Sequence, residues 1–111
     1  MQRISVVSLN LWNTEYWEER KDCVASFVQT YAADVYCFQE VRPQTLTFLD
    51  DALHGYVRIE GEEEGWRCEN SIYLRKDRFE VDAFGRVDLQ MPEIHRGLFW
   101  TKVRTTEGTP L

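Results

Sequence analysis

The first half of the chain alternates apolar segments with helical patterns, and this order limits the fold more than any other feature. Residues 4–12 and 34–41 are rich in β-branched, aromatic and other apolar side chains, which favours strands. Residues 15–31 between them carry apolar side chains at helical spacing. These are Trp17, Val24, Phe27, Val28 and Tyr31. A strand, a helix and a strand in this order predict a parallel pair joined by a right-handed crossover.

The rest of the chain carries a second helix and then only short strands. Pro43 suits the first turn of this helix, and Gly55 follows its last turn. Its buried face is marked by Leu46, Leu49 and Leu53. Further strands are predicted over residues 55–60, 66–76, 78–89 and 96–104. We therefore expect an α/β fold with a mixed sheet and two helices, in which segments 66–76 and 78–89 form a hairpin.

The apolar segments also predict where side chains are buried. Little alternation is visible over residues 4–12, which indicates a strand covered on both faces. Residues 96–104 alternate cleanly but carry apolar side chains on both faces. Trp12 and Trp100 are expected in the core.

Length, charge and cysteine content narrow the class of protein. A chain of 111 residues is within the usual size of one domain. The net charge of −6, from 19 acidic and 13 basic residues, argues against a general nucleic-acid-binding surface. Three cysteines without a C-x-x-C motif predict free thiols and a cytoplasmic location. No segment approaches the length of a membrane span, and the N-terminus does not have the pattern of a signal peptide.

The second predicted strand ends in a carboxylate. Glu40 follows Gln39 after an apolar run, and an unpaired carboxylate in a core is so costly that it neutralises or finds a partner. Asn10 closes the first strand, and ligands of open α/β sheets bind where parallel strands end. One carboxylate with a nearby amide fits magnesium, which prefers oxygen ligands and keeps several waters. Glu40 therefore either meets a cation or is a solvated strand end.

Four motifs in order give the chain a family resemblance. They are SLNLWN (8–13), FQEV (38–41), ENSIYLRKDRFEV (69–81) and RGLFWTKV (96–103). With these motifs the chain resembles the endonuclease/exonuclease/phosphatase family. The resemblance implies the N-terminal half of a two-sheet α/β sandwich whose site lies at the strand ends. It also implies cleavage of phosphate esters with magnesium, or with manganese as the alternative ion.

The resemblance also implies roles for individual residues. Glu40 and Asn10 fall on catalytic and metal-binding positions, while Arg96 and Asn70 fall on substrate-binding positions. Many members carry an acid two residues before the place of Asn70, where this chain has Cys68, with Glu69 one step away. Ordinary structural roles stand beside these. Asn10 suits a turn or a cap, Arg96 suits an ion pair, and Asn70 suits backbone hydrogen bonding within a strand.

The motifs of the family's second half are not found in the sequence. An N-T-H-L strand, a G-D-F-N loop and a terminal Asp-His pair would supply the nucleophilic water, its base and a phosphate-stabilising histidine. We therefore expect a domain truncated after Leu111, without appreciable turnover by itself. The function hypothesis is a metal-dependent phosphoesterase lacking part of its site, and the alternative is a non-catalytic binding or interaction module.

The partners expected for such a chain follow from the same resemblance. The substrate would be a phosphate ester: a nucleic acid, a phospholipid head group or a small phosphodiester. A sheet without its facing partner exposes apolar surface, so the isolated chain is expected to self-associate.

Overall fold

Six strands and two helices make up the parts of the chain that the computed structural model describes, residues 3–60, 69–93 and 97–108. In chain order they are β1 (Val6–Asn10), α1 (Trp17–Tyr31), β2 (Val35–Gln39), α2 (Pro43–Ala52), β3 (Tyr56–Arg58), β4 (Asn70–Arg75), β5 (Phe79–Asp88) and β6 (Gly97–Thr105). The predicted order of elements is confirmed, and each observed element lies within its predicted segment except β6, which extends one residue further, to Thr105.

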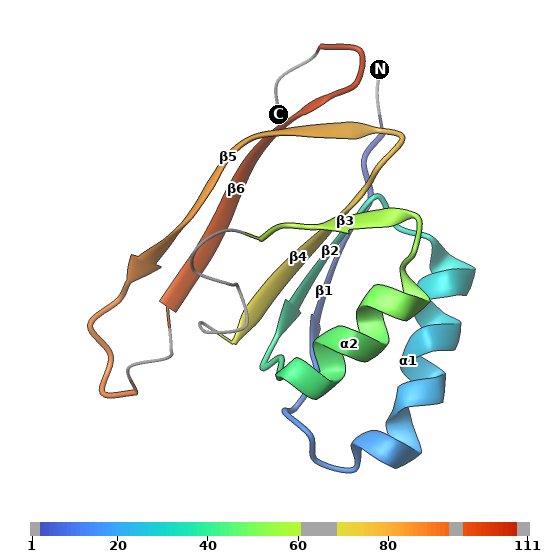
Figure 1. The fold of residues 1–111 in the computed structure, drawn as a ribbon, viewed down its shortest axis with the longest axis vertical. Coiled ribbons are helices and arrows are strands. Elements are labelled where there is room, and N and C mark those ends of the chain that lie inside the picture. Colours follow the sequence, from blue (N-terminus) through green and yellow to red (C-terminus); the bar gives the residue numbers. More distant parts are fainter. Residues whose placement is uncertain (1–2, 61–68, 94–96, 109–111) are drawn as a thin grey trace.

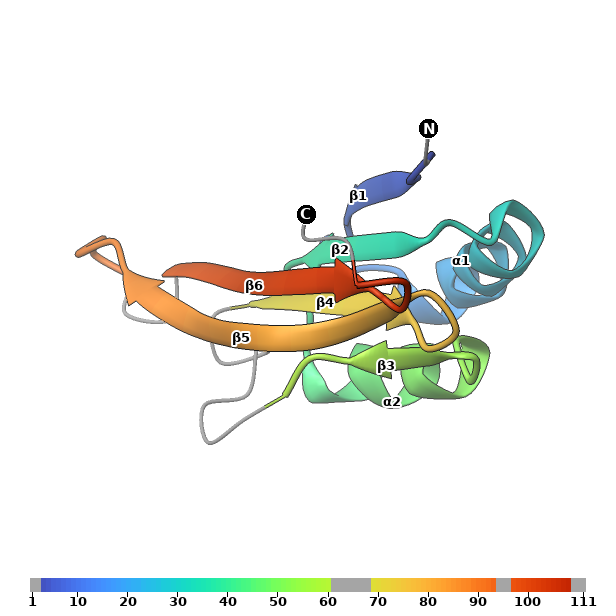
Figure 2. The same cartoon turned by 90° about the horizontal axis from the view of Figure 1, so that it is seen from above.

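The strands form two sheets. The first has the order β1-β2-β4-β3, with β1 parallel to β2 and the other pairs antiparallel. The second is the antiparallel pair β5-β6. Figure 1 shows the four-stranded sheet between the two helices on the right and the β5-β6 pair on the left. Seen from above, β1, β2, β4 and β3 follow one another from top to bottom (Figure 2). The expected α/β fold with a mixed sheet is therefore confirmed.

Alternation along the strands builds two cores, one on each face of the first sheet. Tyr36 and Phe38 of β2 are buried in a cluster with α1 and α2. The intervening Val35 and Cys37 pack instead against a cluster between the sheets. That second cluster consists of Ile59, Ile72, Leu74, Phe79, Phe99 and Val103. Successive side chains of a strand point to opposite faces, so β2 contributes to both cores.

Helix α1 buries a narrower face than its sequence predicts. Trp17, Val24 and Val28 are buried, whereas Phe27 and Tyr31 are exposed. The two exposed rings stack on each other, with centroids 5.6 Å apart. Helix α2 follows its prediction, since Leu46 and Leu49 are buried and the C-cap residue Leu53 is buried as well.

The predicted hairpin of segments 66–76 and 78–89 is wrong. Strand β4 pairs with β2 and β3 in the first sheet, while β5 pairs with β6 in the second. The four inner residues of β4, 71–74, are all buried, because helices cover one face and the second sheet covers the other. A strand buried on both sides suits the centre of a sheet, and the short turn at residues 76–78 therefore carries the chain from one sheet to the other.

Three predictions of burial are also wrong. In β1, Val7 and Leu9 pack against the helical core, but Val6 is 61% exposed, so only one face of the strand is covered. Trp12 follows β1 in a loop and is 52% exposed. Trp100 lies on the outer face of β6, across from Gly85, where an added Cβ would come within 3.0 Å of the indole. Glycine at this position leaves room for the Trp100 ring to lie flat on the sheet.

Within the described ranges, no helix is long and apolar enough to cross a membrane. Cys23 and Cys37 are free thiols, and burial raises the pKa of Cys37. Cys68 lies outside the described residues.

A buried carboxylate fixes the amino end of β2. Asp34 accepts hydrogen bonds from the backbone N–H of Ser5 at 2.9 Å and from its hydroxyl at 3.2 Å. Arg78 lies 2.8 Å from the other carboxylate oxygen. Burial by itself raises the pKa of Asp34, but the Ser5 hydrogen bonds and the Arg78 guanidinium outweigh it and leave this pKa below its ordinary value.

We expect Asp34→Asn to lower the free energy of unfolding by about 1–3 kcal/mol near neutral pH, because it weakens charge-assisted hydrogen bonds. A folded-state pKa below the unfolded value means that this contribution is present above the unfolded pKa and is lost as pH falls through the folded pKa. The variant should therefore lose stability less steeply than the wild type between the two pKa values. Denaturant unfolding across this range measures both effects. Asp77→Asn, at an exposed ion pair with Arg75, is the control and should change little.

Candidate functional site

Three amide side chains form a row where strands meet at one edge of the first sheet. Asn10 pairs with Gln39 across β1 and β2, and Gln39 pairs with Asn70 across β2 and β4. Residues paired directly share one face of a sheet, so the row lies on a single face. Figure 1 shows β1 and β2 ending, and β4 and β6 beginning, at the same lower end of the molecule. The edge therefore brings together three of the four predicted site residues: Asn10, Asn70 and Glu40, which follows Gln39.

Glu40 follows that row in an unusual backbone conformation. Its φ is 56°, in the left-handed region that non-glycine residues rarely adopt. Its carboxylate Oε1 accepts a hydrogen bond of 3.1 Å from the side-chain amide of Asn13. Trp12, Asn13 and Glu69 at the same edge also have positive φ values, of 55°, 52° and 60°. Strain of this kind clusters at functional sites, because ordinary structure has no reason to keep it.

Asn10 has the turn role that the sequence left open. Its Oδ1 accepts a hydrogen bond of 2.8 Å from the backbone N–H of Trp12, as in an Asx turn. The side chain is nevertheless exposed, and an amide oxygen has two lone pairs. Asn10 can therefore hold the turn and still face a ligand at the edge.

Asn70 joins the two sheets. Its Nδ2 donates to the backbone carbonyl of Gly97, the first residue of β6, at 3.0 Å. The alternative of a backbone partner for Asn70 is thus observed, although the carbonyl belongs to the other sheet. Arg96, the predicted phosphate-binding residue, lies outside the described residues.

Glu69 has a structural partner that the sequence does not reveal. The residue is buried, and its Oε1 lies 2.5 Å from the guanidinium of Arg42. Its backbone carbonyl accepts a hydrogen bond of 3.1 Å from the N–H of Val41. Arg42 balances the charge of this second carboxylate, so Glu69 fixes the junction between β2 and β4.

The donor set at the edge fits a hard cation that keeps much of its water. In the described part of the chain, no three Asp, Glu, His or Cys side chains converge as metal ligands. Glu40 instead stands among amides, and the Oδ1 of Asn13 is buried without a hydrogen-bond partner in the described residues. A carboxylate beside an unsatisfied amide oxygen suits magnesium or manganese rather than a softer metal.

Asn13 is the site residue that sequence reasoning missed. It is the second asparagine of the SLNLWN motif, and only the first, Asn10, closes the strand. Nothing in the local pattern shows that Asn13 reaches Glu40, since the two are 27 residues apart in sequence. The one available signal was a second short amide directly after a strand end, a common turn position.

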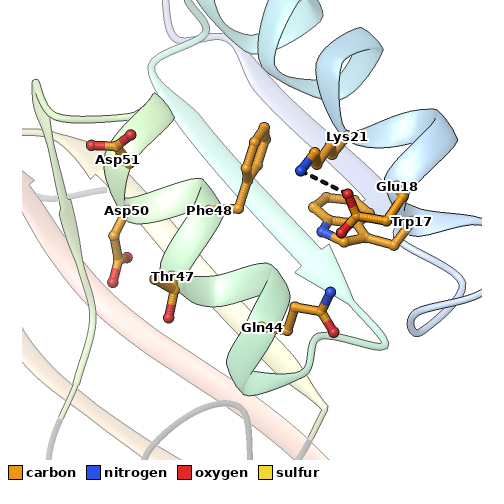
Figure 3. Close-up of a pocket in the computed structure, with 8 residues that line it drawn as sticks. All are labelled: Trp17, Glu18, Lys21, Gln44, Thr47, Phe48, Asp50 and Asp51. Carbon is orange, nitrogen blue, oxygen red and sulfur yellow. Dashed lines mark ion pairs between the residues drawn. The ribbon is translucent and has the colours of Figure 1, made fainter.

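A separate hollow lies between the two helices. Figure 3 shows its walls, with the ion pair of Lys21 and Glu18 at 2.8 Å. It is lined by Trp17, Glu18, Lys21, Gln44, Thr47, Phe48, Asp50 and Asp51. Trp17 and Phe48 meet edge to face there, with ring centroids 5.4 Å apart. None of the sequence-predicted site residues lines this hollow, and its form follows from the packing of α1 on α2.

Residues 7–109 match the model of the endonuclease/exonuclease/phosphatase family. The chain belongs to this family. Its members are generally dependent on a divalent metal ion, in agreement with the chemistry of the strand-end residues. Comparison with curated proteins gave no match.

Solved structures share the fold at low sequence identity. TDP2 of D. rerio, complexed with a single-strand DNA product, matches 97% of this chain with a TM-score of 0.81 and 24% identity. A mannosyl-6-phosphatase of Bacteroides thetaiotaomicron matches 98% with a TM-score of 0.76 and 21% identity. The chain covers 43% and 49% of these two proteins, and thus spans less than half of their length. These similarities confirm the endonuclease/exonuclease/phosphatase fold.

The left-handed backbone of Glu40 has a measurable cost. Glu40→Gly and Glu40→Ala both remove the carboxylate, but only glycine adopts a positive φ without penalty. We expect the glycine variant to have the higher free energy of unfolding, by about 1 kcal/mol. Denaturant unfolding measures the difference. The same pair at Gln44, in the first turn of α2, should show the opposite order, because alanine is the better helix former. An alanine variant at position 40 as stable as the glycine variant would contradict the prediction.

Proposed function

We propose that this chain carries the metal-binding part of a phosphoester hydrolase site. The observation that supports this most directly is Glu40 itself. It stands at the carboxyl edge of a parallel strand pair, in a left-handed backbone, with its carboxylate held by Asn13. The family's hydrolases provide the reaction class, and the geometry of this edge provides the residues.

Glu40 would hold the metal ion as the one carboxylate ligand, with the amide oxygens of Asn10 and Asn13 beside it. A divalent ion here would neutralise charge on the phosphate and lower the pKa of a bound water. Asn13 would fix the orientation of the carboxylate, since its Nδ2 already donates to Oε1. The Trp12 N–H would orient Asn10 in the same way, because it donates to Oδ1.

The phosphate would lie over the amide row. Asn70 is fixed by its hydrogen bond to Gly97, which also holds the start of β6 against the first sheet. Arg96 immediately precedes Gly97 in sequence, and we propose it as the group that contacts the substrate phosphate. A guanidinium suits this role because its planar fork matches two phosphate oxygens.

The substrate class stays at the level of a phosphate ester. One structural relative is complexed with a DNA product and another is a sugar phosphatase, so the fold supports different substrates. The net charge of −6 weighs against a long nucleic acid, which needs many basic contacts. A location in a reducing cytosol is also proposed, on the free thiols of Cys23 and Cys37.

The alternative is a binding module without catalysis. The sequence does not contain the family motifs that supply the water-orienting groups and the phosphate-stabilising histidine. Positioned acid–base groups contribute about 10²–10⁴-fold to a rate, so we expect this chain by itself to bind a metal without appreciable turnover. Clear magnesium-dependent hydrolysis of a simple phosphodiester, lost in Glu40→Gln, would favour a complete catalytic site instead.

Metal titration tests the proposed site. We expect weak magnesium binding, because one carboxylate and a few amides leave most of the coordination to water. Glu40→Gln keeps the shape of the side chain, removes its charge, and should weaken binding by at least about tenfold, since loss of a hydrogen-bond partner of a metal ligand already costs that much. Isothermal titration with magnesium and with manganese measures this. Glu80→Gln is the matched control, since Glu80 is an exposed acid of β5 facing Arg104. Equal affinities of wild type and Glu40→Gln would refute the site.

Self-association is the second proposal to test. Among the described residues, β1 pairs only with β2, so one edge of the strand is open. Val6 is exposed on this edge strand, and open apolar edges invite pairing with another chain. We expect a dimer in sedimentation velocity at micromolar concentration. Val6→Lys should shift it toward monomer, because lysine on an edge strand opposes pairing. A wild-type monomer that is stable to dilution would contradict the proposal.

A further inference from the structure

An exposed pair of aromatic rings stands beside the strand-end site. Trp12 and Tyr16 belong to the loop between β1 and α1, with ring centroids 5.8 Å apart and planes tilted by 45°. Trp12 is 52% exposed and Tyr16 is 64% exposed. Single exposed apolar side chains are normal on protein surfaces. Two rings fixed together next to a candidate metal site call for a more specific explanation.

The loop is attached to Asn10 and Glu40, two of the three proposed metal-binding residues. The backbone N–H of Trp12 donates to Oδ1 of Asn10 at 2.8 Å. The side chain of Asn13, the next residue, donates to Oε1 of Glu40 at 3.1 Å. These two hydrogen bonds, one at Trp12 itself and one at the next residue, set the position of Trp12 relative to the strand-end site.

Helix α1 holds the loop from the other side. Arg20 donates through Nη2 to the carbonyl of Leu11 and through Nε to the carbonyl of Glu15, both at 2.9 Å. Its guanidinium carbon also lies 5.8 Å from the centroid of the Trp12 ring, within the range of a cation–π contact. The indole is thus supported while half of its surface stays open to solvent.

The backbone of this loop is strained where it presents the rings. Trp12, Asn13 and Tyr16 have φ values of 55°, 52° and 53°. Left-handed conformations in non-glycine residues cost of the order of 1 kcal/mol each. A loop that is strained, hydrogen-bonded and cation-supported holds its exposed rings in place before any ligand arrives. Such preorganisation reduces the entropy that binding would otherwise cost.

We propose that Trp12, with Tyr16 beside it, is a stacking surface for an aromatic base carried next to the substrate phosphate. This inference rests on the proposed function for the position of the phosphate, and it narrows the substrate class to nucleotides. Base stacking needs only a flat aromatic face. A sugar would need several polar side chains around the rings, but Arg20 and the Nδ2 of Asn13 are engaged within the protein, and the Oδ1 of Asn13 is buried. The net charge of −6 favours a mononucleotide or a short nucleic-acid end over a long strand.

The test compares two ligands that share a phosphate but differ in the base. AMP and ribose 5-phosphate are titrated into the protein with magnesium present, and dissociation constants are obtained from NMR chemical shifts. We expect AMP to bind about tenfold more tightly, the size of one base–aromatic stack. Equal affinities, or no binding of either ligand, would overturn the proposal.

Substitutions test whether the preference for AMP over ribose 5-phosphate comes from the Trp12 ring. Trp12→Phe keeps an aromatic face and should keep most of the preference for AMP. Trp12→Leu keeps apolar volume without a flat face and should bind both ligands equally. Trp100→Leu, at the exposed tryptophan of β6, is the control and should behave as the wild type. If Trp12→Leu still bound AMP more tightly than ribose 5-phosphate, the assignment of base stacking to Trp12 would be overturned. Cooperative unfolding of each variant verifies that it folds.

The same titrations separate this inference from the proposed function. Glu40→Gln and omission of magnesium should weaken both ligands by a similar factor and leave their ratio unchanged. A Trp12-dependent preference without any effect of metal or Glu40 would reject the proposed function and support the stacking surface. If magnesium and Glu40 strengthen binding but AMP and ribose 5-phosphate bind equally well, the proposed function would be supported and the stacking surface rejected. A four-nucleotide single strand that binds more tightly than AMP, again through Trp12, would identify a strand end as the natural source of the base.

Discussion

The parallel pairing of β1 with β2 is the constraint on which the site depends. Parallel strands need a crossover, and α1 provides it while covering one face of the sheet. The same pairing ends both strands at one edge, where Asn10 stands beside Gln39. A shift of one residue in register would turn every side chain of β1 to the opposite face. The packing of the half-buried Val7 and Leu9 against the helical core therefore also fixes the position of Asn10.

The two ends of β2 carry carboxylates in different settings. Asp34 at the amino end is buried, accepts hydrogen bonds from Ser5 and forms an ion pair with Arg78. Both of its carboxylate oxygens therefore have partners within the protein. Glu40 at the carboxyl end is half-buried in a strained backbone and is held by the amide of Asn13. Glu69, close to Glu40, is balanced by Arg42. Of the three carboxylates, Glu40 is the one that we propose as the metal ligand.

Sequence patterns predict local order better than they predict pairing. Strand and helix positions follow from periodicity and from Pro43, and the meeting of Asn10 with the end of β2 follows from the crossover. The pairing partners of β4 cannot be predicted in this way, because they depend on burial from two sides by segments distant in sequence. The exposure of Trp12 could not be predicted, because apolar character alone does not distinguish a buried ring from an exposed one. The contact of Asn13 with Glu40 could not be predicted either, because it depends on a left-handed backbone that no spacing encodes.

The strand order also determines when the fold can close during synthesis. Strand β4 is the fourth strand in sequence, yet it lies between β2 and β3 in the sheet. Until residues 70–75 leave the ribosome, β3 has no strand to pair with in the part of the chain described, and β2 has only β1. The nascent chain can form the β1-α1-β2 unit early, because its contacts are comparatively local. Completion of the first sheet waits for this central strand, and the core between the sheets waits longer, until Phe79 of β5 and Phe99 and Val103 of β6 have followed.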